Sequence, residues 1–318
     1  MIDYYVLGSG ISGTTISNHI AKKNSVEILD KAKGIGGRAS HRRYLDNLGF
    51  DHGLQYISPK SKNFTKFITA LERKKILKKW DGKHISSNKT ISKKYIGKYG
   101  NNDISKYLSK NIKINFNTNI KKIRFNKNYW EITLDNKKIL KSKNLILTCP
   151  YPQTISLAKK FLNKKMLKLS VKMVPIITLM LVYKKKNFNN ISSIKFNSEI
   201  ISFAAYENSK KRFNSNAHLW TIQSSIKWAK KFINTYKKQK KNTQNILSNE
   251  FNKILGIKNN KIIFKNIHGW KFAYNNNKTT IKSFWSKKYK LGICGDWFLG
   301  PKAEDAWTSA KDLIKKLS

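Results

Sequence analysis

Residues 4–38 read YYVLGSGISGTTISNHIAKKNSVEILDKAKGIGGR, and this stretch decides the fold. A short apolar run at residues 4–7 leads directly into the turn GSGISG at residues 8–13. Apolar side chains at helical spacing follow, and a second apolar run at residues 26–29 ends at Asp30. The order of strand, glycine turn, helix, strand and acid predicts two parallel strands joined by a helix.

The three glycines of the turn have separate physical roles. Gly8 permits the tight turn, Gly10 lets a pyrophosphate approach the backbone, and Gly13 lets the helix pack close to the strand. The phosphates are expected at the positive end of the helix, against its free N–H groups. Asp30 lies 17 residues after Gly13, where a carboxylate can accept hydrogen bonds from an adenosine ribose. The sequence therefore predicts a dinucleotide site, with contacts at Gly8, Ser9, Gly10, Ile11, Ser12, Gly13 and Asp30.

The residues after Asp30 indicate which kind of dinucleotide the site binds. Lys31 follows the acid directly, and a glycine pair at residues 36–37 precedes Arg38. Two adjacent glycines allow a second backbone segment to reach the pyrophosphate, and Arg38 can neutralise it with a bidentate contact. A plain NAD domain needs none of these features, so further cofactor contacts are predicted at Lys31, Gly37 and Arg38.

The segments GSGISG, LDKAKGIGGRASHRR and FDHGLQYI together resemble the flavin amine-oxidase group, and most closely its renalase-like branch of FAD-dependent oxidoreductases. The resemblance implies FAD as cofactor and an α/β fold. It implies a Rossmann-type FAD-binding domain of the glutathione-reductase or p-hydroxybenzoate-hydroxylase kind, with an inserted mixed β-sheet substrate domain. The FAD-binding domain is expected to be discontinuous, at residues 1–63, 99–160 and 285–318. Residues 64–98 and 161–284 are then expected to form the substrate domain.

The resemblance also assigns residues to the flavin. In this group the segment FDHGLQYI runs beside the isoalloxazine ring, which implicates Gly53, Gln55 and Tyr56. Ile120 is expected against the adenine. Near the C-terminus, a strand that ends in Gly-Asp and a following helix are expected to hold the flavin through Gly295, Asp296, Ala306 and Trp307. Asp305 replaces a glycine that is usual in relatives, and a negative charge there is expected to weaken the helix dipole.

Aromatic residues of the second half are expected to form the substrate pocket. HLWTIQ at residues 218–223 and IHGWKFA at residues 267–273 resemble the substrate domain of renalase-like proteins. The predicted substrate-pocket residues are Tyr56, Trp220, His268 and Trp270, although core packing is an equal alternative for each tryptophan. Gly269 stands where relatives usually carry arginine, which puts substrate anchoring there in doubt.

The resemblance implies a renalase-like oxidase. Such an enzyme accepts hydride from a reduced small molecule, most closely a dihydronicotinamide isomer of NAD(P)H, and O2 then reoxidises the flavin to give H2O2. No catalytic residue is assigned, because the hydride chemistry belongs to the cofactor. One alternative is a flavin amine oxidase acting on a primary or secondary amine, with Tyr56 and Trp220 or Trp270 as an aromatic cage. A remote alternative is a basic flavoprotein that binds nucleic acid, with an affinity that falls steeply with salt.

The composition adds a strong charge imbalance. Lys and Arg number 65 against 17 Asp and Glu, a formal net charge of +48. The lysines occur in every segment, which is typical of a solvated basic surface, and a field that draws anionic ligands to the site stays open. No nucleic-acid-binding motif is recognised, so no specific nucleic acid is expected as a partner.

Other sequence features point to a cytoplasmic protein without a membrane partner. No apolar run approaches the roughly 20 residues needed to span a bilayer, and the N-terminus carries no basic leader. Cys149 and Cys294 lie in apolar strand-like runs, which favours buried free thiols. No cluster of cysteine and histidine has the spacing of a metal site.

Overall fold

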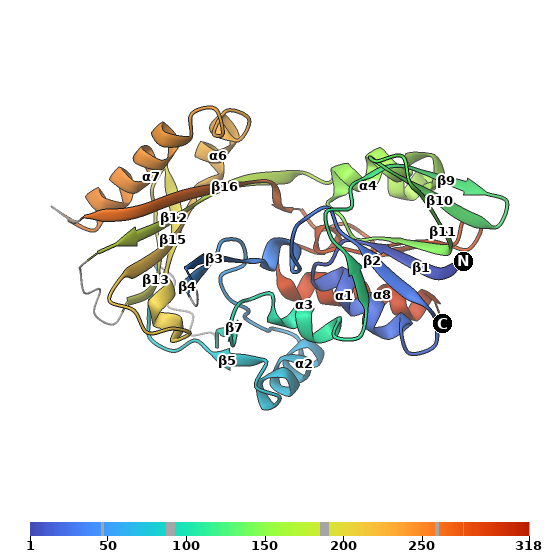
Figure 1. Cartoon of the computed structure of the whole chain (residues 1–318), viewed down its shortest axis with the longest axis horizontal. Helices are drawn as coiled ribbons and strands as arrows, with labels where there is room; N and C mark the ends of the chain where they lie inside the picture. The colour runs from blue at the N-terminus through green and yellow to red at the C-terminus, as the bar shows by residue number, and fades with distance from the viewer. Residues whose placement is uncertain (46–47, 87–92, 185–190, 258–260, 276, 318) are drawn as a thin grey trace.

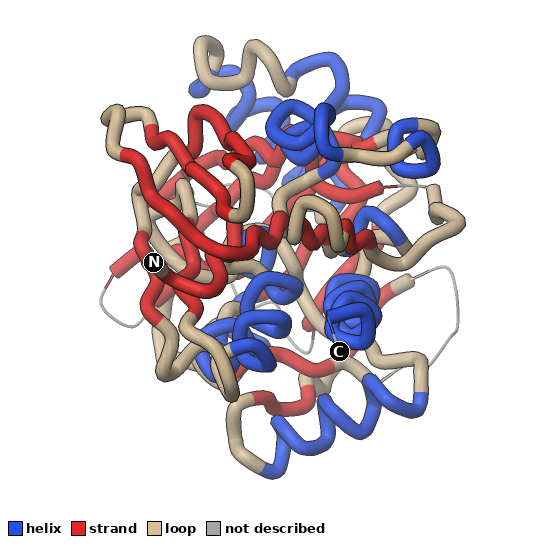
Figure 2. The backbone as a smooth tube through the Cα atoms, turned by 90° about the vertical axis from the view of Figure 1, so that its right-hand side faces the viewer, coloured by secondary structure: helices blue, strands red, loops and turns tan. Residues whose placement is uncertain are grey.

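The computed structural model describes residues 1–45, 48–86, 93–184, 191–257, 261–275 and 277–317. In these ranges the chain forms two domains side by side, each built on its own large sheet (Figure 1). We call them the first domain, which contains both termini, and the second domain. The two termini lie at the same end of the molecule, and this end faces the viewer in Figure 2.

The first domain is organised on a sheet of eight strands in the described part of the chain. Its main path is β17 (Phe284–Ser286), β18 (Leu291–Ile293), β11 (Ile139–Leu147), β1 (Ile2–Leu7), β2 (Val26–Leu29) and β8 (Lys113–Asn115). The hairpin of β9 (Ile120–Asn126) and β10 (Tyr129–Leu134) joins β11. β1 pairs in parallel with both β2 and β11, as the opening motif predicts.

Helices cover both faces of this sheet (Figure 1). On one face, α1 (Ile11–Ile20) and α8 (Ala303–Leu317) pack against β1, β2 and β11 through a buried apolar cluster that includes Val6, Ile16 and Leu313. On the other face lie α4 (Tyr151–Ala158), η2 (Lys159–Phe161) and α5 (Lys164–Leu167). Because parallel strands are buried on both faces, their sequences read as continuous apolar runs.

The second domain is organised on a sheet of six strands in the described ranges. Their order is β16 (Ile262–Asn275), β12 (Met173–Tyr183), β15 (His218–Ser224), β14 (Ile201–Tyr206), β13 (Ile191–Lys195) and β6 (Lys83–Ile85). α6 (Ile226–Phe232) and α7 (Lys240–Ile254) cover one face, where they bury Leu179, Leu181 and Trp220. The opposite face buries Met180 and Val182 of β12 against Phe50 of the first half of the chain. β12, the second strand in this order, is therefore buried on both sides.

Two further sheets of the described chain have two strands each. β3 (His41–Leu45) pairs with β4 (Leu48–Asp51), and β5 (Leu77–Lys79) pairs with β7 (Tyr95–Gly97). Among the described residues of 64–98, only β6 joins the six-stranded sheet, whereas α2 (Lys62–Arg73), β5 and β7 pack in a cluster that contains Ile11 and Ala303. α3 (Asp103–Leu108) and the single-turn helices η1 (Gly37–Ala39), η3 (Glu207–Lys210) and η4 (Asp296–Phe298) complete the described structure.

Candidate functional site

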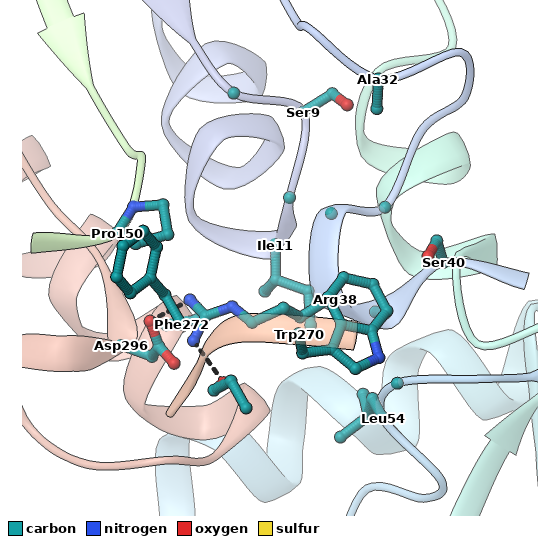
Figure 3. A pocket seen from close by; sticks show the side chains of 18 of the residues that line it. Ser9, Ile11, Ala32, Arg38, Ser40, Leu54, Pro150, Trp270, Phe272 and Asp296 are labelled. Atoms are coloured by element: carbon teal, nitrogen blue, oxygen red, sulfur yellow. Dashed lines mark hydrogen bonds and ion pairs between the residues drawn. The ribbon is translucent and has the colours of Figure 1, made fainter. Parts of the chain in front are cut away.

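A single cavity of about 2240 Å³ runs from the loop after β1 to strand β16 (Figure 3). We call it the cleft. Its glycine end comprises residues 8–13, Asp30 and residues 36–38, and its aromatic end comprises His52, Tyr56, His268 and Trp270. The cleft therefore joins the opening motif to residues that lie more than two hundred positions later in the sequence.

The glycine end is shaped by backbone. Gly8 adopts a φ of 111°, which favours glycine, and a Cβ on Gly13 would lie 1.9 Å from the carbonyl oxygen of Gly8. Gly10 is the N-cap of α1, and no side chain caps the helix there. A Cβ on Gly10 would have no neighbour closer than Gly36 O at 3.9 Å, so space remains in front of the helix N-terminus. This geometry suits an anion held by backbone N–H groups.

Asp30 is fixed at the same end. Its Oδ2 accepts hydrogen bonds from the backbone N of Ser9 at 2.7 Å and from Ser9 Oγ at 2.5 Å. Its Oδ1 accepts from the backbone N of Ala32 at 2.8 Å. A carboxylate has about four acceptor positions, so Asp30 retains capacity for a ligand hydroxyl. Lys31 and Ile120 line the cleft nearby.

Arg38 crosses the middle of the cleft (Figure 3). It follows Gly36 and Gly37, which have φ values of 117° and 53°, and Gly36 N donates to Ser9 O at 3.1 Å. The guanidinium donates to Asp296 Oδ1 at 2.5 Å and to the carbonyl of Ala273 at 2.8 Å. Arg38 therefore connects the glycine pair to both β16 and η4.

The aromatic end is made by side chains. The rings of His52 and Trp270 lie 5.1 Å apart, and those of His268 and Trp270 lie 4.3 Å apart. Burial, with the nearby charges of His268 and Arg42, lowers the pKa of His52 to about 3. Burial, with the charges of Arg42 and Lys237, lowers the pKa of His268 to about 4. Both imidazoles are therefore neutral at pH 7.

Gly53 and Tyr56 complete that wall of the cleft. A Cβ on Gly53 would lie 2.0 Å from Arg38 O and 3.2 Å from Trp270 Cζ2, so only glycine fits between them. Tyr56 packs near Trp80 and Phe203, and burial raises the pKa of its hydroxyl. Gln55 also lines the cleft and donates to the carbonyl of Gly53 at 3.2 Å.

Most of the predicted contact residues line the cleft, and three do not. Trp220 is fully buried on the far face of the six-stranded sheet, where it packs with Tyr206 and Phe251. Trp307 packs against Phe64 and Phe67 of α2. Gly295 lies beside the Trp297 ring, whereas its neighbour Asp296 faces the cleft. The cage of Tyr56 and Trp220 considered above is therefore wrong, because the two side chains lie on opposite faces of the six-stranded sheet.

Gly269 and Asp305 have local structural roles. A Cβ on Gly269 would lie 2.4 Å from the ring of Tyr236, whose hydroxyl accepts from Gly269 N at 3.0 Å. Tyr236 thus occupies the space beside Gly269. Asp305 accepts from the backbone N of Lys302 at 2.9 Å, which caps the start of α8, and burial raises the pKa of its carboxyl.

The sequence did not single out Arg42, His52 or Gln223 as contacts, and all three line the cleft. Arg42 follows the glycine pair within the same motif, and its charge acts on both histidines. Among the residues that line the cleft, eleven are lysine or arginine and three are acidic. The three acids are Asp30, Asp296 and Glu304, and each is engaged by hydrogen bonds from this chain. The cleft is therefore electropositive.

Comparisons with known proteins agree with this architecture. A family model described as an NAD(P)-binding Rossmann-like domain matches residues 6–71. The structure of a proposed protoporphyrinogen oxidase from Exiguobacterium sp. 255-15 matches over 99% of this chain and 98% of its own, with a TM-score of 0.76 at 9% identity. The structure of putrescine oxidase bound to putrescine matches over 99% of this chain and 98% of its own chain, with a TM-score of 0.68 at 11% identity. The structure of a Pyrococcus furiosus protein matches over 99% of this chain and 97% of its own chain, with a TM-score of 0.66 at 11% identity.

These similarities confirm the predicted fold class, a Rossmann-type nucleotide-binding domain with a second, mixed-sheet domain. In the described ranges, no helix is both long and apolar enough to cross a membrane. Nor do the described residues hold a group of three or more His, Cys, Asp or Glu side chains that could bind a metal ion.

Proposed function

We propose that this chain is an FAD-dependent oxidoreductase of the flavin amine-oxidase kind, and that its substrate is a dihydronicotinamide. One observation carries the proposal: a glycine-built anion site and an aromatic, electropositive end belong to one continuous cleft. A dinucleotide with a flat ring at one end has this same order of parts. The similarity to solved oxidases over the whole chain supports the proposal at the level of fold.

The residues present fit FAD. The space in front of Gly10 and the uncapped N-terminus of α1 suit a pyrophosphate, and Asp30 suits a ribose hydroxyl. Arg38 lines the cleft beside the glycine pair, and its guanidinium, which also contacts Asp296 and the carbonyl of Ala273, suits a phosphate oxygen. When bound, FAD supplies a ring that takes up a hydride equivalent and passes the electrons to O2, giving H2O2.

The chain's own groups orient the substrate rather than exchange protons with it. His52 and His268 stay neutral at pH 7, so they offer hydrogen bonds without charge. The indole of Trp270 gives an apolar face for a flat ring. Oxidation of a dihydronicotinamide requires loss of a hydride alone, which agrees with an aromatic end that has no carboxylate among its lining residues.

The charge of the cleft favours this substrate over an amine. Arg42, Arg43, Lys195 and Lys271 line the cleft, and their field attracts phosphate groups and repels ammonium groups. An amine has to enter as the neutral base and would gain nothing from these four cations. Amine oxidation is therefore the second candidate function. The observation that supports it is the structural similarity to putrescine oxidase.

An anaerobic absorbance titration of the FAD-loaded protein tests the proposal. The first titrant is a mixture of dihydronicotinamide isomers, and simple amines follow. We expect rapid bleaching of the flavin by a dihydronicotinamide and recovery of the colour in air. Bleaching by amines alone would replace the substrate assignment, and a protein that does not take up FAD would overturn the proposal entirely.

A further inference from the structure

Four charged side chains are buried where the two domains meet. Asp51 ends β4, Glu207 and Lys210 belong to η3, and Arg212 follows η3. The most exposed of them, Arg212, has 3% of its side chain accessible. Lys210 Nζ lies 2.8 Å from Asp51 Oδ2 and 2.9 Å from Glu207 Oε2. Two acids and two bases balance, which is the condition under which buried charge is tolerated.

Asp51 is also tied to the first domain. Its Oδ1 accepts from the backbone N of Asn101 at 3.0 Å and lies 3.0 Å from His41 Nδ1. Arg212 donates to Asp51, to the carbonyl of Gly97 at 3.0 Å and to Asn101 Oδ1 at 3.1 Å. Burial by itself raises the pKa of Asp51, but the charges of Arg212 and Lys210 outweigh it and hold the pKa well below its usual range. Asp51 is therefore ionised, and it contacts Asn101, His41, Lys210 and Arg212 at once.

Side chains of the second domain hold the backbone that follows Asp51. The carbonyl of His52 accepts from Trp270 Nε1 at 2.8 Å, and the carbonyl of Gly53 accepts from Gln223 Nε2 at 2.7 Å. Asp51 N donates to Glu207 Oε1 at 3.3 Å, and Glu207 in turn accepts from Thr221 Oγ1 at 2.6 Å. We call residues 51–56 the wall segment. Each of its first three residues thus donates or accepts a backbone hydrogen bond across the domain junction.

Lys210 reaches both ends of the wall segment. In addition to the carboxylates of Asp51 and Glu207, the ammonium of Lys210 contacts Gln55 Oε1 at 3.4 Å. It lies 5.3 Å from the centre of the Trp80 ring. The ammonium thus donates hydrogen bonds to Asp51 and Gln55 and forms an ion pair with Glu207. Relative motion is the default between two domains unless their interface is large and apolar, and polar contacts add to such a constraint. The Lys210 contacts supply such a constraint at the aromatic end of the cleft.

We propose that Lys210 is a positioning residue, which fixes the wall segment against Trp270 and so sets the width of the aromatic end. The proposal rests on the proposed function, because Gly53, Gln55 and Tyr56 of the wall segment line the cleft and are the residues that the sequence predicts beside the flavin ring. It adds a requirement that the function alone does not contain: the substrate and the flavin keep their relative geometry only while Lys210 bridges Asp51, Glu207 and Gln55. A misplacement of about 1 Å between reacting groups can cost about a hundredfold in rate.

The test compares Lys210→Met and Lys210→Arg in the FAD-loaded full-length chain. Anaerobic stopped-flow reduction with dihydronicotinamide isomers gives the limiting rate of flavin reduction and the half-saturating concentration. We expect Lys210→Met to lower the limiting rate by about tenfold or more. The FAD dissociation constant should change by less than about threefold, because the glycine end is untouched. Lys210→Arg should recover part of the rate.

A control and a second variant keep the test decisive. Lys113→Met removes another lysine–carboxylate pair, with Glu27 at 3.0 Å on the edge strand β8, and should behave as the parent protein because neither residue lines the cleft. If Lys210→Met does not fold, Gln223→Met removes a wall contact without leaving a buried charge and should lower the rate in the same direction. An unchanged limiting rate in a folded Lys210→Met protein, or a loss of rate matched by an equal loss of FAD affinity, would overturn the proposal.

The visible circular dichroism of bound FAD separates this proposal from the proposed function. It reports the surroundings of the ring whether or not a substrate is turned over. A parent protein that binds FAD but is not reduced by any dihydronicotinamide contradicts the substrate assignment. A changed flavin spectrum in Lys210→Met would still support the positioning role, whereas an identical spectrum and rate would contradict it.

Discussion

The two ends of the cleft are built in different ways. The glycine end comes from 31 consecutive residues, 8–38, and its surface is mostly backbone. The aromatic end combines side chains from the segment after β4 and from β15 and β16, which are brought together by folding. One end uses groups that every residue carries, and the other uses groups that particular residues carry.

This difference affects what each end can recognise. Backbone N–H groups at a helix N-terminus bind phosphate whatever lies beyond it, so the glycine end suits any dinucleotide. Neutral histidines, an indole and several basic side chains favour a smaller molecule of matching shape and charge. Cofactor binding and substrate choice are therefore expected to respond separately to mutation.

The largest effects are expected from the glycines of the first end, in a matched pair of variants. A methyl group in Gly13→Ala would lie 1.9 Å from Gly8 O and 2.9 Å from Thr148 Oγ1, where backbone has to move. We expect Gly13→Ala to lower the free energy of unfolding by about 3 kcal/mol or more. Urea denaturation measures it, and a stable Gly13→Ala protein would contradict the packing described for α1 and β1.

Gly10→Ala is the matched control. Its backbone φ of −74° suits any residue, and its methyl group would have no protein neighbour closer than 3.9 Å. The variant should therefore fold normally yet lose FAD, because the methyl group occupies the space assigned to the pyrophosphate. A Gly10→Ala protein that retains the parent affinity for FAD would show that the pyrophosphate lies elsewhere.

Asp30→Asn comes next in size. The substitution removes the charge from an acceptor of three hydrogen bonds and from the predicted ribose contact. Charged hydrogen bonds contribute about 1.5–3 kcal/mol, so the FAD dissociation constant should rise roughly tenfold to a hundredfold. Glu27→Gln, within β2 three residues before Asp30 and paired with the exposed Lys113, is the control and should leave FAD binding unchanged.

The fold could be predicted from the sequence because its deciding motif acts through local backbone geometry. Gly8, Gly13 and Asp30 need only their own neighbours to define a strand, a turn and a helix. The aromatic end depends on strand register, which single residues do not reveal. Trp220 and Gln223 lie three positions apart on β15, yet they face opposite sides of the sheet, and only Gln223 reaches the cleft.

The buried charges were beyond sequence analysis for a similar reason. Asp51 and Lys210 lie 159 positions apart and contact each other only after both domains have formed. Among 65 basic residues, nothing local distinguishes Lys210 or Arg212 from solvated lysines and arginines. Burial decides their role, and burial is a property of the tertiary structure.

The aromatic end should make the protein sensitive to acid. The unfolded chain binds protons on histidine with a pKa near 6.5, whereas His52 and His268 stay neutral until about pH 3 and 4. The free energy of unfolding should therefore fall as the pH falls from about 6.5 to 4.5, by about 2 kcal/mol for each histidine. Urea unfolding at pH 7 and pH 4.5 measures the change.

The variant His52→Phe isolates that contribution from acid effects elsewhere. It keeps a ring beside Trp270 but cannot bind a proton, so its stability should depend less steeply on pH than that of the parent protein. The FAD affinity at pH 7 should stay close to that of the parent. An equal pH dependence in the two proteins would show that His52 titrates normally, and the buried, neutral imidazole described here would be wrong.

The smallest effect on the cofactor is expected at Trp307, although the sequence placed it among the flavin contacts. Its ring stacks on Phe67 at 5.4 Å and contacts Phe64 of α2, so its contribution is to packing. Trp307→Phe should lower the free energy of unfolding by about 1 kcal/mol and leave the FAD affinity and the visible flavin spectrum unchanged. Tyr56→Leu, at the aromatic end, should instead shift the spectrum, because Tyr56 lines the cleft. If Trp307→Phe shifts the spectrum as much as Tyr56→Leu, then Trp307 acts on the bound flavin, and a role in packing alone would be wrong.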